Sequence, residues 1–416
     1  MCVAIMDYRM TGSTGNPTSR RRFIKYVGAA GAVGVAGCLG DDGEDVDEFV
    51  IGSNHPLSGF LGDTGTRMDN AVKLAAMLKN EEGGIESLGG AEVSVISGDN
   101  EGDQALGGEV TDELVEEGAH VLTGCFSSPV TSAATVAAEA HQIPFVISVS
   151  VADDILQADQ LNYAYRPQPR SDQMAHDLAD MLPEVIRDAG HSIDTAGIYY
   201  IDIDFGQSIR DSLREYLPQQ NIEIVQEVGV DFGETPDVQA TALRDADPDV
   251  VIPVSYLAET VNLMSAMNGI DYQPPFIAGC ANEAMNDRGA IGDMGDIVEG
   301  QFGTNFALNP TIDRADEIRD RYEDEYDLGF DANIAMTFAA TEVILAAVEE
   351  AGSADPDDIN DTLSEITVEE HIAAMPAITF DDRGENENAI APLHQIQDGN
   401  DLIVFPEEFA ATQVQL

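Results

Sequence analysis

Lysine is almost absent from this chain. Its 416 residues include only Lys25, Lys73 and Lys79, and 19 basic residues stand against 77 acidic ones, a formal net charge of −58. With no basic surface available, nucleic-acid binding is disfavoured. Such self-repulsion destabilises a compact chain at low ionic strength, but molar salt shortens the Debye length to about 3 Å and screens it. We therefore expect a protein of concentrated brine from a haloarchaeal cell. A hydrophobic fraction of 44% argues against an acidic disordered chain.

Cysteine is scarce and paired histidine is missing. Of four cysteines, Cys125 and Cys280 lie in the body of the chain, and they show no metal-type spacing with each other or with histidine. The seven histidines are scattered, and none is paired at i,i+4. The sequence contains no Gly-x-Ser-x-Gly elbow and no phosphate-binding loop. We expect no metal, no cofactor and no catalytic activity.

Residues 1–38 are predicted to be an export signal. A charged stretch precedes an apolar, small-residue segment of about a dozen residues, short of the roughly 20 that a membrane-spanning helix needs. Ser19–Lys25 resembles a twin-arginine signal whose arginines are Arg20 and Arg21, and Val35–Cys38 resembles a lipoprotein processing box. This implies a lipid on Cys38 that holds the mature chain at the outer face of the cell membrane. A transmembrane helix or a disordered tail is the alternative, and the true start methionine stays open.

The body of the chain alternates between strand and helix patterns. An acidic, Gly-rich linker over residues 39–48 is followed by short apolar strands that alternate with one-faced helices, the pattern of βαβ units and parallel sheets. About 378 residues follow the signal, too many for one core, so we predict two α/β lobes. Strands are expected at 49–52, 93–97, 119–123, 144–148, 195–201, 222–230, 250–254, 276–278, 377–380, 394–397 and 402–405. Helices are expected at 67–80, 104–117, 130–141, 171–189, 207–217, 237–245, 258–268, 312–326, 332–351 and 359–366.

Three stretches carry a family resemblance. Ile51–Gly59 ends in a Pro-Leu-Ser-Gly turn, Asp99–Asp103 is an acidic turn, and Gly124–Val130 is a Ser-rich turn followed by the strand Ile143–Ser148. In this order and spacing they resemble the solute-binding proteins of ABC importers, of the branched-chain amino acid and amide type (the leucine/isoleucine/valine-binding protein family). The resemblance covers nearly all of residues 49–405.

The resemblance implies a two-lobed type I periplasmic-binding-protein fold. Each lobe is then a parallel sheet flanked by helices, and three crossovers join the lobes. Carried over, lobe 1 is residues 49–166 plus 305–375, and lobe 2 is residues 167–304 plus 376–416. Cys125 and Cys280 fall in opposite lobes, where a bridge would lock the cleft. We therefore expect free thiols.

Lobe 1 is expected to hold the ligand at two turns. Ser127 and Ser128 follow a strand end and precede a helix, so free N–H groups and the positive helix end would face the cleft and suit a carboxylate or carbonyl. A plain helix cap is the alternative, and the resemblance favours binding. The second turn is Ser150-Val151-Ala152. Amino-acid binders of the family usually carry Thr where this chain has Ala152, so Ser150 is expected to contribute its hydroxyl or its backbone.

Lobe 2 is expected to close the cleft with aromatic residues. Tyr256 follows the strand at 250–254, where the family often has an aromatic residue that closes over the ligand; core packing is the alternative. Phe205 stands where the family commonly carries Tyr before Gly, and it is expected at the mouth. Thr64 of lobe 1 matches a rim position that is often aromatic in the family.

In the family an acidic residue pairs with the ligand ammonium, and this chain has no acidic residue at the aligned position. Residues 280–282 align with it, which puts Asn282 near that place and Glu283 just beyond. Burying an ammonium without a carboxylate is costly. Unless Glu283 or Asp153 takes the role, the ligand lacks an α-ammonium, and an amide, a urea-like compound or a carboxylate is then expected.

Together these features predict a monomeric, lipid-anchored receptor outside the cytoplasm. It would deliver a branched-chain or related amino acid, an amide or a urea-like compound to the permease subunits of an ABC importer by hinge closure. Its partners would be the small-molecule ligand, the permease and the membrane, through the lipid on Cys38. A sensor for chemotaxis or signalling on the same fold is the main alternative. A secreted hydrolase that uses Ser127 or Ser128 is a weaker one.

Overall fold

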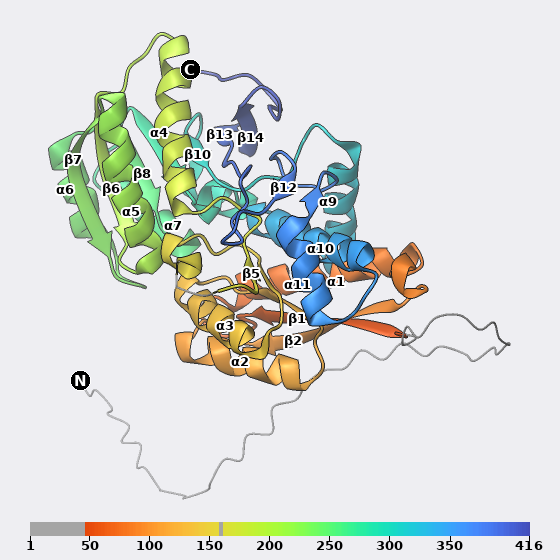
Figure 1. The fold of residues 1–416 in the computed structure, drawn as a ribbon. Helices are drawn as coiled ribbons and strands as arrows, with labels where there is room; N and C mark the ends of the chain where they lie inside the picture. Colours follow the sequence, from red (N-terminus) through yellow and green to blue (C-terminus); the bar gives the residue numbers. More distant parts are fainter. Residues whose placement is uncertain (1–45, 158–160) are drawn as a thin grey trace, which may run out of the picture. The chain divides into compact units, whose positions relative to one another are not determined.

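The computed structural model describes residues 46–157 and 161–416 (Figure 1). Residues 44–416 form one compact unit. Arg20, Arg21 and Cys38 of the predicted export signal lie outside the described residues, so the signal and the lipid anchor stay predictions.

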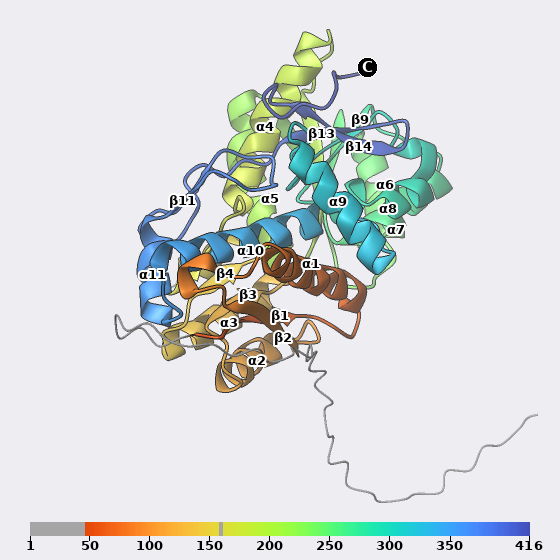
Figure 2. The ribbon, with the colours of Figure 1, turned by 90° about the vertical axis from the view of Figure 1, so that its right-hand side faces the viewer.

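A first sheet of five parallel strands is built from the N-terminal third of the chain. Its elements are β1 (Glu48–His55), α1 (Gly62–Glu81), β2 (Glu92–Asp99), α2 (Gln104–Glu116), β3 (Val121–Gly124), α3 (Ser128–His141), β4 (Phe145–Ile147) and β5 (Ala164–Tyr165). The strand order is β2-β1-β3-β4-β5, and every neighbouring pair is parallel. Val121 and Leu122 are adjacent in β3, so their side chains point to opposite faces, and both are fully buried, as expected for a sheet covered on both faces. In Figure 2, α1 lies on one face of this sheet and α2 and α3 on the other.

A second sheet of seven strands comes next along the chain. Its elements are α4 (Ser171–Asp188), β6 (Thr195–Ile201), α5 (Asp204–Tyr216), β7 (Glu223–Val230), α6 (Asp237–Ala246), β8 (Val250–Val254), α7 (Leu257–Gly269), β9 (Phe276–Cys280), α8 (Arg288–Met294), β10 (Phe302–Thr304), β13 (Leu393–Gln397) and β14 (Asn400–Phe405). The order is β14-β13-β10-β9-β8-β6-β7. Strands β6 to β10 are parallel, whereas β13 and β14 add an antiparallel hairpin at one edge.

The segment between β10 and β13 returns to the first sheet. It contains α9 (Asp313–Tyr326), α10 (Ala332–Ala351), α11 (Pro356–Glu365), β11 (Thr367–Val368) and β12 (Ile378–Thr379). Helix α10 packs against α1, β3 and β4, and α9 contacts α1 (Figure 2). We call the first sheet with α1–α3 and α9–α11 the first lobe, and the second sheet with α4–α8 the second lobe. The chain therefore passes between the two sheets three times.

Helix α10 is the core helix of the first lobe. Among the described residues it alone is long and apolar enough to cross a membrane, but 83% of its most apolar window is buried inside the protein. Burial on nearly all sides is what an all-round apolar helix requires in a globular protein.

The predicted order of strands and helices is confirmed along the described chain, with short additions. Strands β5, β10 and β11 and helix α8 were not predicted. Helix α1 begins at Gly62 rather than Arg67, and α5 begins at Asp204 rather than Gln207, because their first turns carry no apolar periodicity. The exact lobe boundaries, near residues 166, 304 and 376, stay predictions.

The charge balance predicts strong dependence of stability on salt. Lowering NaCl from about 3 M to about 0.1 M lengthens the Debye length from about 2–3 Å to about 10 Å, so the repulsion between carboxylates is no longer screened. We expect the melting temperature to fall progressively over this range, as measured by circular dichroism. Sucrose is the control, because it favours compact states without screening charge. Full restoration of the melting temperature by sucrose at low salt would contradict charge repulsion as the cause.

Candidate functional site

A small cavity lies between the two lobes, beyond the carboxyl ends of the parallel strands. Its volume is about 40 Å³. The walls are mostly apolar and aromatic, with a few polar groups: Phe126, Ser128, Val149, Ser150, Val151, Phe205, Ser255, Tyr256, Ala281, Glu283, Asn305, Phe306 and Asn333. Ligands of open α/β sheets bind at this end of the strands, because the loops there are the ones that face a crevice.

Four of these residues stand at the beginnings of helices. Ser128 is the first residue of α3 and Phe205 the second of α5, Tyr256 caps α7, and Asn333 lies in the first turn of α10. Each helix presents its positive end and its unpaired first-turn N–H groups toward the cavity side. The arrangement favours a negative group such as a carboxylate in the cavity.

The turn before α3 is fixed by a close backbone approach. Gly124 has φ of +138°, and a Cβ there would lie 2.1 Å from the carbonyl oxygen of Asn54 in β1. Only glycine fits at this point. Ser127 is the N-cap residue of α3, and its side chain makes no capping hydrogen bond. The Oγ of Ser128 instead accepts a hydrogen bond from the backbone N–H of Ala152 at 3.4 Å, which ties the two predicted turns together.

Ser150 lines the cavity with its hydroxyl committed to the protein. The hydroxyl is shared with that of Thr131 and donates to the carbonyl of Phe126 at 3.0 Å. The carbonyl of Ser150 accepts from the side-chain amide of Gln168 at 3.0 Å. Ser150 therefore shapes the wall, and the expected direct contribution of its hydroxyl to a ligand would require breaking these bonds.

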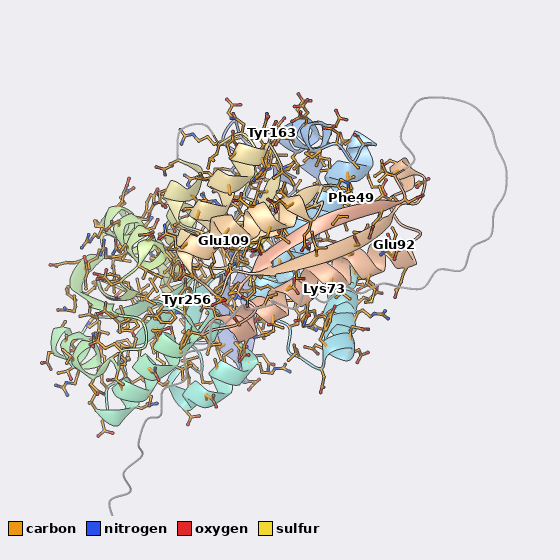
Figure 3. The ribbon with its side chains drawn as sticks, turned by 90° about the horizontal axis from the view of Figure 1, so that it is seen from below. Phe49, Lys73, Glu92, Glu109, Tyr163 and Tyr256 are labelled. Carbon is orange, nitrogen blue, oxygen red and sulfur yellow. The ribbon has the colours of Figure 1, made fainter. Side chains whose placement is uncertain are left out.

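Tyr256 lies where the two lobes meet (Figure 3) and is the centre of an aromatic cluster. Its ring stacks on Phe205 with centroids 5.4 Å apart and lies 5.3 Å from the ring of Phe126, which belongs to the first lobe. Burial raises the pKa of the Tyr256 hydroxyl above its usual value, and the approach of the Ser127 side chain opposes that rise. The pair does not reach hydrogen-bond geometry, so the buried hydroxyl stays without a partner. Asn333 likewise has a buried side-chain nitrogen without a partner. Buried polar groups of this kind suit contact with a ligand.

Glu283 supplies the only charged side chain among the described residues of the cavity wall. It opens a short 3-10 helix (Glu283–Met285) after β9, and one carboxyl oxygen accepts a hydrogen bond from the hydroxyl of Thr64 at 3.2 Å. Burial, followed by repulsion from Asp331, raises the pKa of Glu283 to about 8, against the opposing effect of Arg67. A carboxyl so placed binds a proton or a cation at neutral pH.

The charges around Glu283 also indicate that its carboxyl can take up a cation. Arg67 pairs with Asp331 at 2.6 Å and with Asp287 at 3.3 Å. One guanidinium thus serves two carboxylates directly, which leaves Glu283 without a cation of its own. A ligand ammonium beside Glu283 would supply the missing positive charge.

The comparison with known families decides what kind of protein has this arrangement. The family model described as "Periplasmic binding protein" matches residues 48–400. This chain belongs to the periplasmic binding protein family.

Curated proteins and solved structures resemble this chain along most of its length. The Leu/Ile/Val-binding protein homolog 7 of Brucella abortus (strain 2308) is 25% identical over 382 residues, 89% of this chain and 94% of the relative. The branched-chain amino acid transporter substrate binding protein LivJ of Streptococcus pneumoniae, in complex with isoleucine, superposes with a TM-score of 0.73 at 19% identity, covering 85% of this chain and 97% of that one. A solute binding protein of an ABC transporter from Rhodopseudomonas palustris BisB5, in complex with 3,4-dihydroxy benzoic acid, superposes with a TM-score of 0.75 at 19% identity. It covers 88% of this chain and 99% of that one. The predicted fold, with parallel-sheet lobes flanked by helices, is confirmed.

Five of the nine predicted ligand residues line the cavity of this periplasmic binding protein: Ser128, Ser150, Val151, Phe205 and Tyr256. Four do not. Ala152 is fully buried, and its carbonyl accepts from Arg166 at 2.8 Å. The side-chain amide of Asn282 donates to Pro253, Ser255 and Thr260 within the second lobe. Thr64 and Ser127 stand behind the wall, against Glu283 and Tyr256 respectively.

Of the two acids that the sequence left open, Glu283 lines the cavity. Asp153, the alternative, does not line the cavity; its carboxylate accepts from Ser208 at 3.0 Å and from the backbone N–H of Asp172 at 3.1 Å. The residues that sequence reasoning missed are mainly Asn305, Phe306 and Asn333. They come from the second crossover and from the first turn of α10, where no motif or periodicity marks a ligand contact.

The two lobes contact one another around the cavity. Thr64 and Glu283 are hydrogen-bonded across the cleft, Arg67 of α1 is paired with Asp287 of the second lobe, and the Ser208 hydroxyl of α5 bonds Asp153 of the first lobe. These contacts sit around the cavity, and its small volume follows from them.

The two body cysteines are free and fully buried, as expected. Burial raises the pKa of the Cys280 thiol to about 12 and that of Cys125 further. Because the thiolate is the reactive form, neither should react with a thiol reagent in the folded protein. After unfolding, both should react without prior reduction, as a colorimetric thiol titration would show. Thiols that appear only after a reductant is added would instead reveal a bridge.

Proposed function

We propose that this chain is a lipid-anchored solute receptor at the outer face of the cell membrane. It captures a small amino-acid-like ligand by closing its lobes and delivers that ligand to the permease of an ABC importer, acting as a monomer. Family membership supports the receptor role, and the predicted signal with Cys38 supports the location. An anchor would keep the receptor beside its permease.

The ligand is proposed to be a zwitterion, a branched-chain or related amino acid. The observation that carries this is the polarity of the cavity: helix beginnings at Ser128 and Asn333 suit a carboxylate, and Glu283 suits an ammonium. Between them the aromatic rings and Val149 offer an apolar surface for a hydrocarbon side chain. The Brucella relative is named for leucine, isoleucine and valine, and the pneumococcal structure contains isoleucine.

Capture requires that the lobes separate and close again. A cavity of about 40 Å³ in the closed arrangement holds roughly three water molecules, at about 10–15 Å³ each. An amino acid is larger, so it reaches Glu283 only when the cross-cleft contacts of Thr64 and Arg67 open. The hinge would then be the three crossovers.

Binding without turnover fits the groups on the wall. Among the described residues that line the cavity there is no histidine, lysine or cysteine. The Oγ of Ser128 accepts a hydrogen bond from the backbone N–H of Ala152. The one carboxyl of the wall, Glu283, accepts from Thr64 and not from Ser128, so a hydrolase that uses Ser128 lacks the contact between nucleophile and base that it requires.

A thermal-shift screen in about 3 M salt tests the proposal. The panel contains isoleucine, leucine and valine, each with two partial analogues that lack the ammonium or the carboxylate, together with urea, acetamide and benzoate. A zwitterion at 100 times its Kd should stabilise the protein by about 2.7 kcal/mol. The partial analogues should give little or no shift. A shift with benzoate or an amide, and none with the amino acids, would overturn the zwitterion; no shift with any solute would count against the receptor itself.

A further inference from the structure

Two exposed aromatic side chains meet across the cleft outside the cavity. Phe60 lies between β1 and α1 in the first lobe and is 60% exposed, and Phe232 follows β7 in the second lobe and is 44% exposed. Their rings are 4.4 Å apart at an interplanar angle of 68°. Of the large apolar side chains that the described residues expose, only these two are aromatic. Edge-to-face rings at this distance attract one another beyond the area that they bury.

The exposed pair continues into the cavity wall. The ring of Phe232 meets that of Tyr256 edge-on, with centroids 6.1 Å apart and an angle of 79°. Tyr256 is in turn stacked on Phe205 and lies beside Phe126. A continuous row of rings thus runs from the surface to the cavity. Tyr256 has no hydrogen bond to hold its hydroxyl, so its position depends on the rings around it.

We propose that Phe60 and Phe232 are positioning residues for ligand binding. Phe232 holds Tyr256 against the cavity, and Phe60 holds Phe232. Because Phe60 and Phe232 belong to different lobes, their contact is made only on closure, and it slows the release of a captured ligand. The inference rests on the proposed receptor function and deepens it: the two residues would set how long the ligand stays bound, without touching it.

A double-mutant cycle tests the contact. Isoleucine release is followed by stopped-flow tyrosine fluorescence, which is accessible because the chain has no tryptophan and 11 tyrosines. Phe60→Ala and Phe232→Ala should each speed release by roughly fivefold, with little change in the association rate constant. The double variant should be no faster than Phe232→Ala alone, since the contact can be lost only once. Val136→Ala and Val238→Ala are the controls, one exposed aliphatic side chain in each lobe; they should leave release unchanged.

Two results would overturn the proposal. Release rates equal to those of the valine controls would show that the rings do not act on Tyr256, and independent, multiplicative effects would show that they do not act through each other. If release is unchanged but uptake by cells falls, the pair is a docking patch for another protein and not a positioning device.

A readout without ligand separates this proposal from the receptor function. Small-angle X-ray scattering of the ligand-free variants should give a larger radius of gyration than the wild type and the valine controls, because the closed arrangement loses a contact. Equal radii would overturn the proposal. Failure of wild-type protein to bind isoleucine, with the scattering difference present, would count against the ligand assignment alone.

Discussion

Replacing Glu283 with glutamine should weaken the binding of an amino acid by roughly 100-fold. The variant keeps the size of the side chain and its bond from Thr64, but it removes the carboxylate that would face the ligand ammonium. Truncating one partner of a buried charge pair typically costs about 2–5 kcal/mol, and 100-fold corresponds to about 2.7 kcal/mol. Isothermal titration calorimetry with isoleucine measures the change. Asp153→Asn is the matched control, because Asp153 does not line the cavity and the amide oxygen of asparagine can still accept the hydrogen bond from Ser208 that joins the lobes.

The same variant should make the ligand-free protein more stable near neutral pH. The pKa of Glu283 lies near 8 in the folded chain, against 4.5 for an ordinary glutamate. Between these values the unfolded state releases a proton that the folded state retains, so stability falls as pH rises from about 4.5 to about 8. Glutamine does not titrate, so the variant does not lose this stability. The difference in stability between the variant and wild type should therefore grow as the pH rises from about 4.5 to about 8. Identical pH profiles of the two melting temperatures would contradict the raised pKa.

Ligand binding should release the proton that Glu283 holds in the ligand-free protein. Below pH 8 the carboxyl of Glu283 is protonated, and an ammonium requires it ionised, so the affinity of wild type for isoleucine should rise with pH by up to about tenfold per unit and level off above pH 8. Calorimetry at pH 7 in buffers of different ionisation enthalpy should detect release of close to one proton. A pH-independent affinity with no proton release would place the ammonium elsewhere.

Replacing Arg166 with leucine should destabilise the fold by about 3–5 kcal/mol. Arg166 follows β5 at the first crossover, and its side chain is fully buried. Its guanidinium donates to both carboxyl oxygens of Glu385 and to the carbonyl of Ala152. It thus ties the first crossover to the third and to the turn behind the cavity. Leucine leaves Glu385 without its partner in a site that water hardly reaches.

Urea denaturation in high salt measures the loss, read as a lower midpoint at unchanged slope. Arg244→Leu is the matched control: Arg244 and its partner Asp245 are 42% and 65% exposed, and such pairs contribute at most about 1 kcal/mol. Replacing Glu385 by glutamine in the Arg166→Leu background should recover part of the stability, because it removes the unpaired charge. A loss as small as that of the control would show that the crossover does not depend on this pair.

The fold could be predicted from the sequence because its strands are short apolar runs between one-faced helices. Thr195–Ile201, Val250–Val254 and Ala332–Ala351 were predicted to the residue. Strand β10 was missed because Phe302–Thr304 is three residues long with a glycine at its centre, and it is held in the sheet by pairing with β9 and β13 rather than by its own pattern.

The candidate site was only half predictable, for reasons that are physical. Ser128 and Tyr256 follow strand ends, and strand ends meet at one edge of a parallel sheet, so position along the chain predicts position in space. Asn305, Phe306 and Asn333 reach the cavity because the chain crosses back to the first lobe, which leaves no local trace. Asn282 was predicted to contact the ligand from its alignment with the family, but its side-chain amide donates to Thr260 within the second lobe. The next residue, Glu283, lines the cavity instead.

A crystal structure with isoleucine, or with the zwitterion that gives the largest thermal shift, tests the central claim most directly. We expect a ligand between the lobes, in a cavity wider than the present one of about 40 Å³, with its ammonium about 2.7–3.2 Å from a carboxyl oxygen of Glu283 and its carboxylate at the beginning of α3 beside Ser128. The side chain should lie against Tyr256. A ligand bound outside this cavity, or one whose carboxylate lies next to Glu283, would contradict the proposed binding mode.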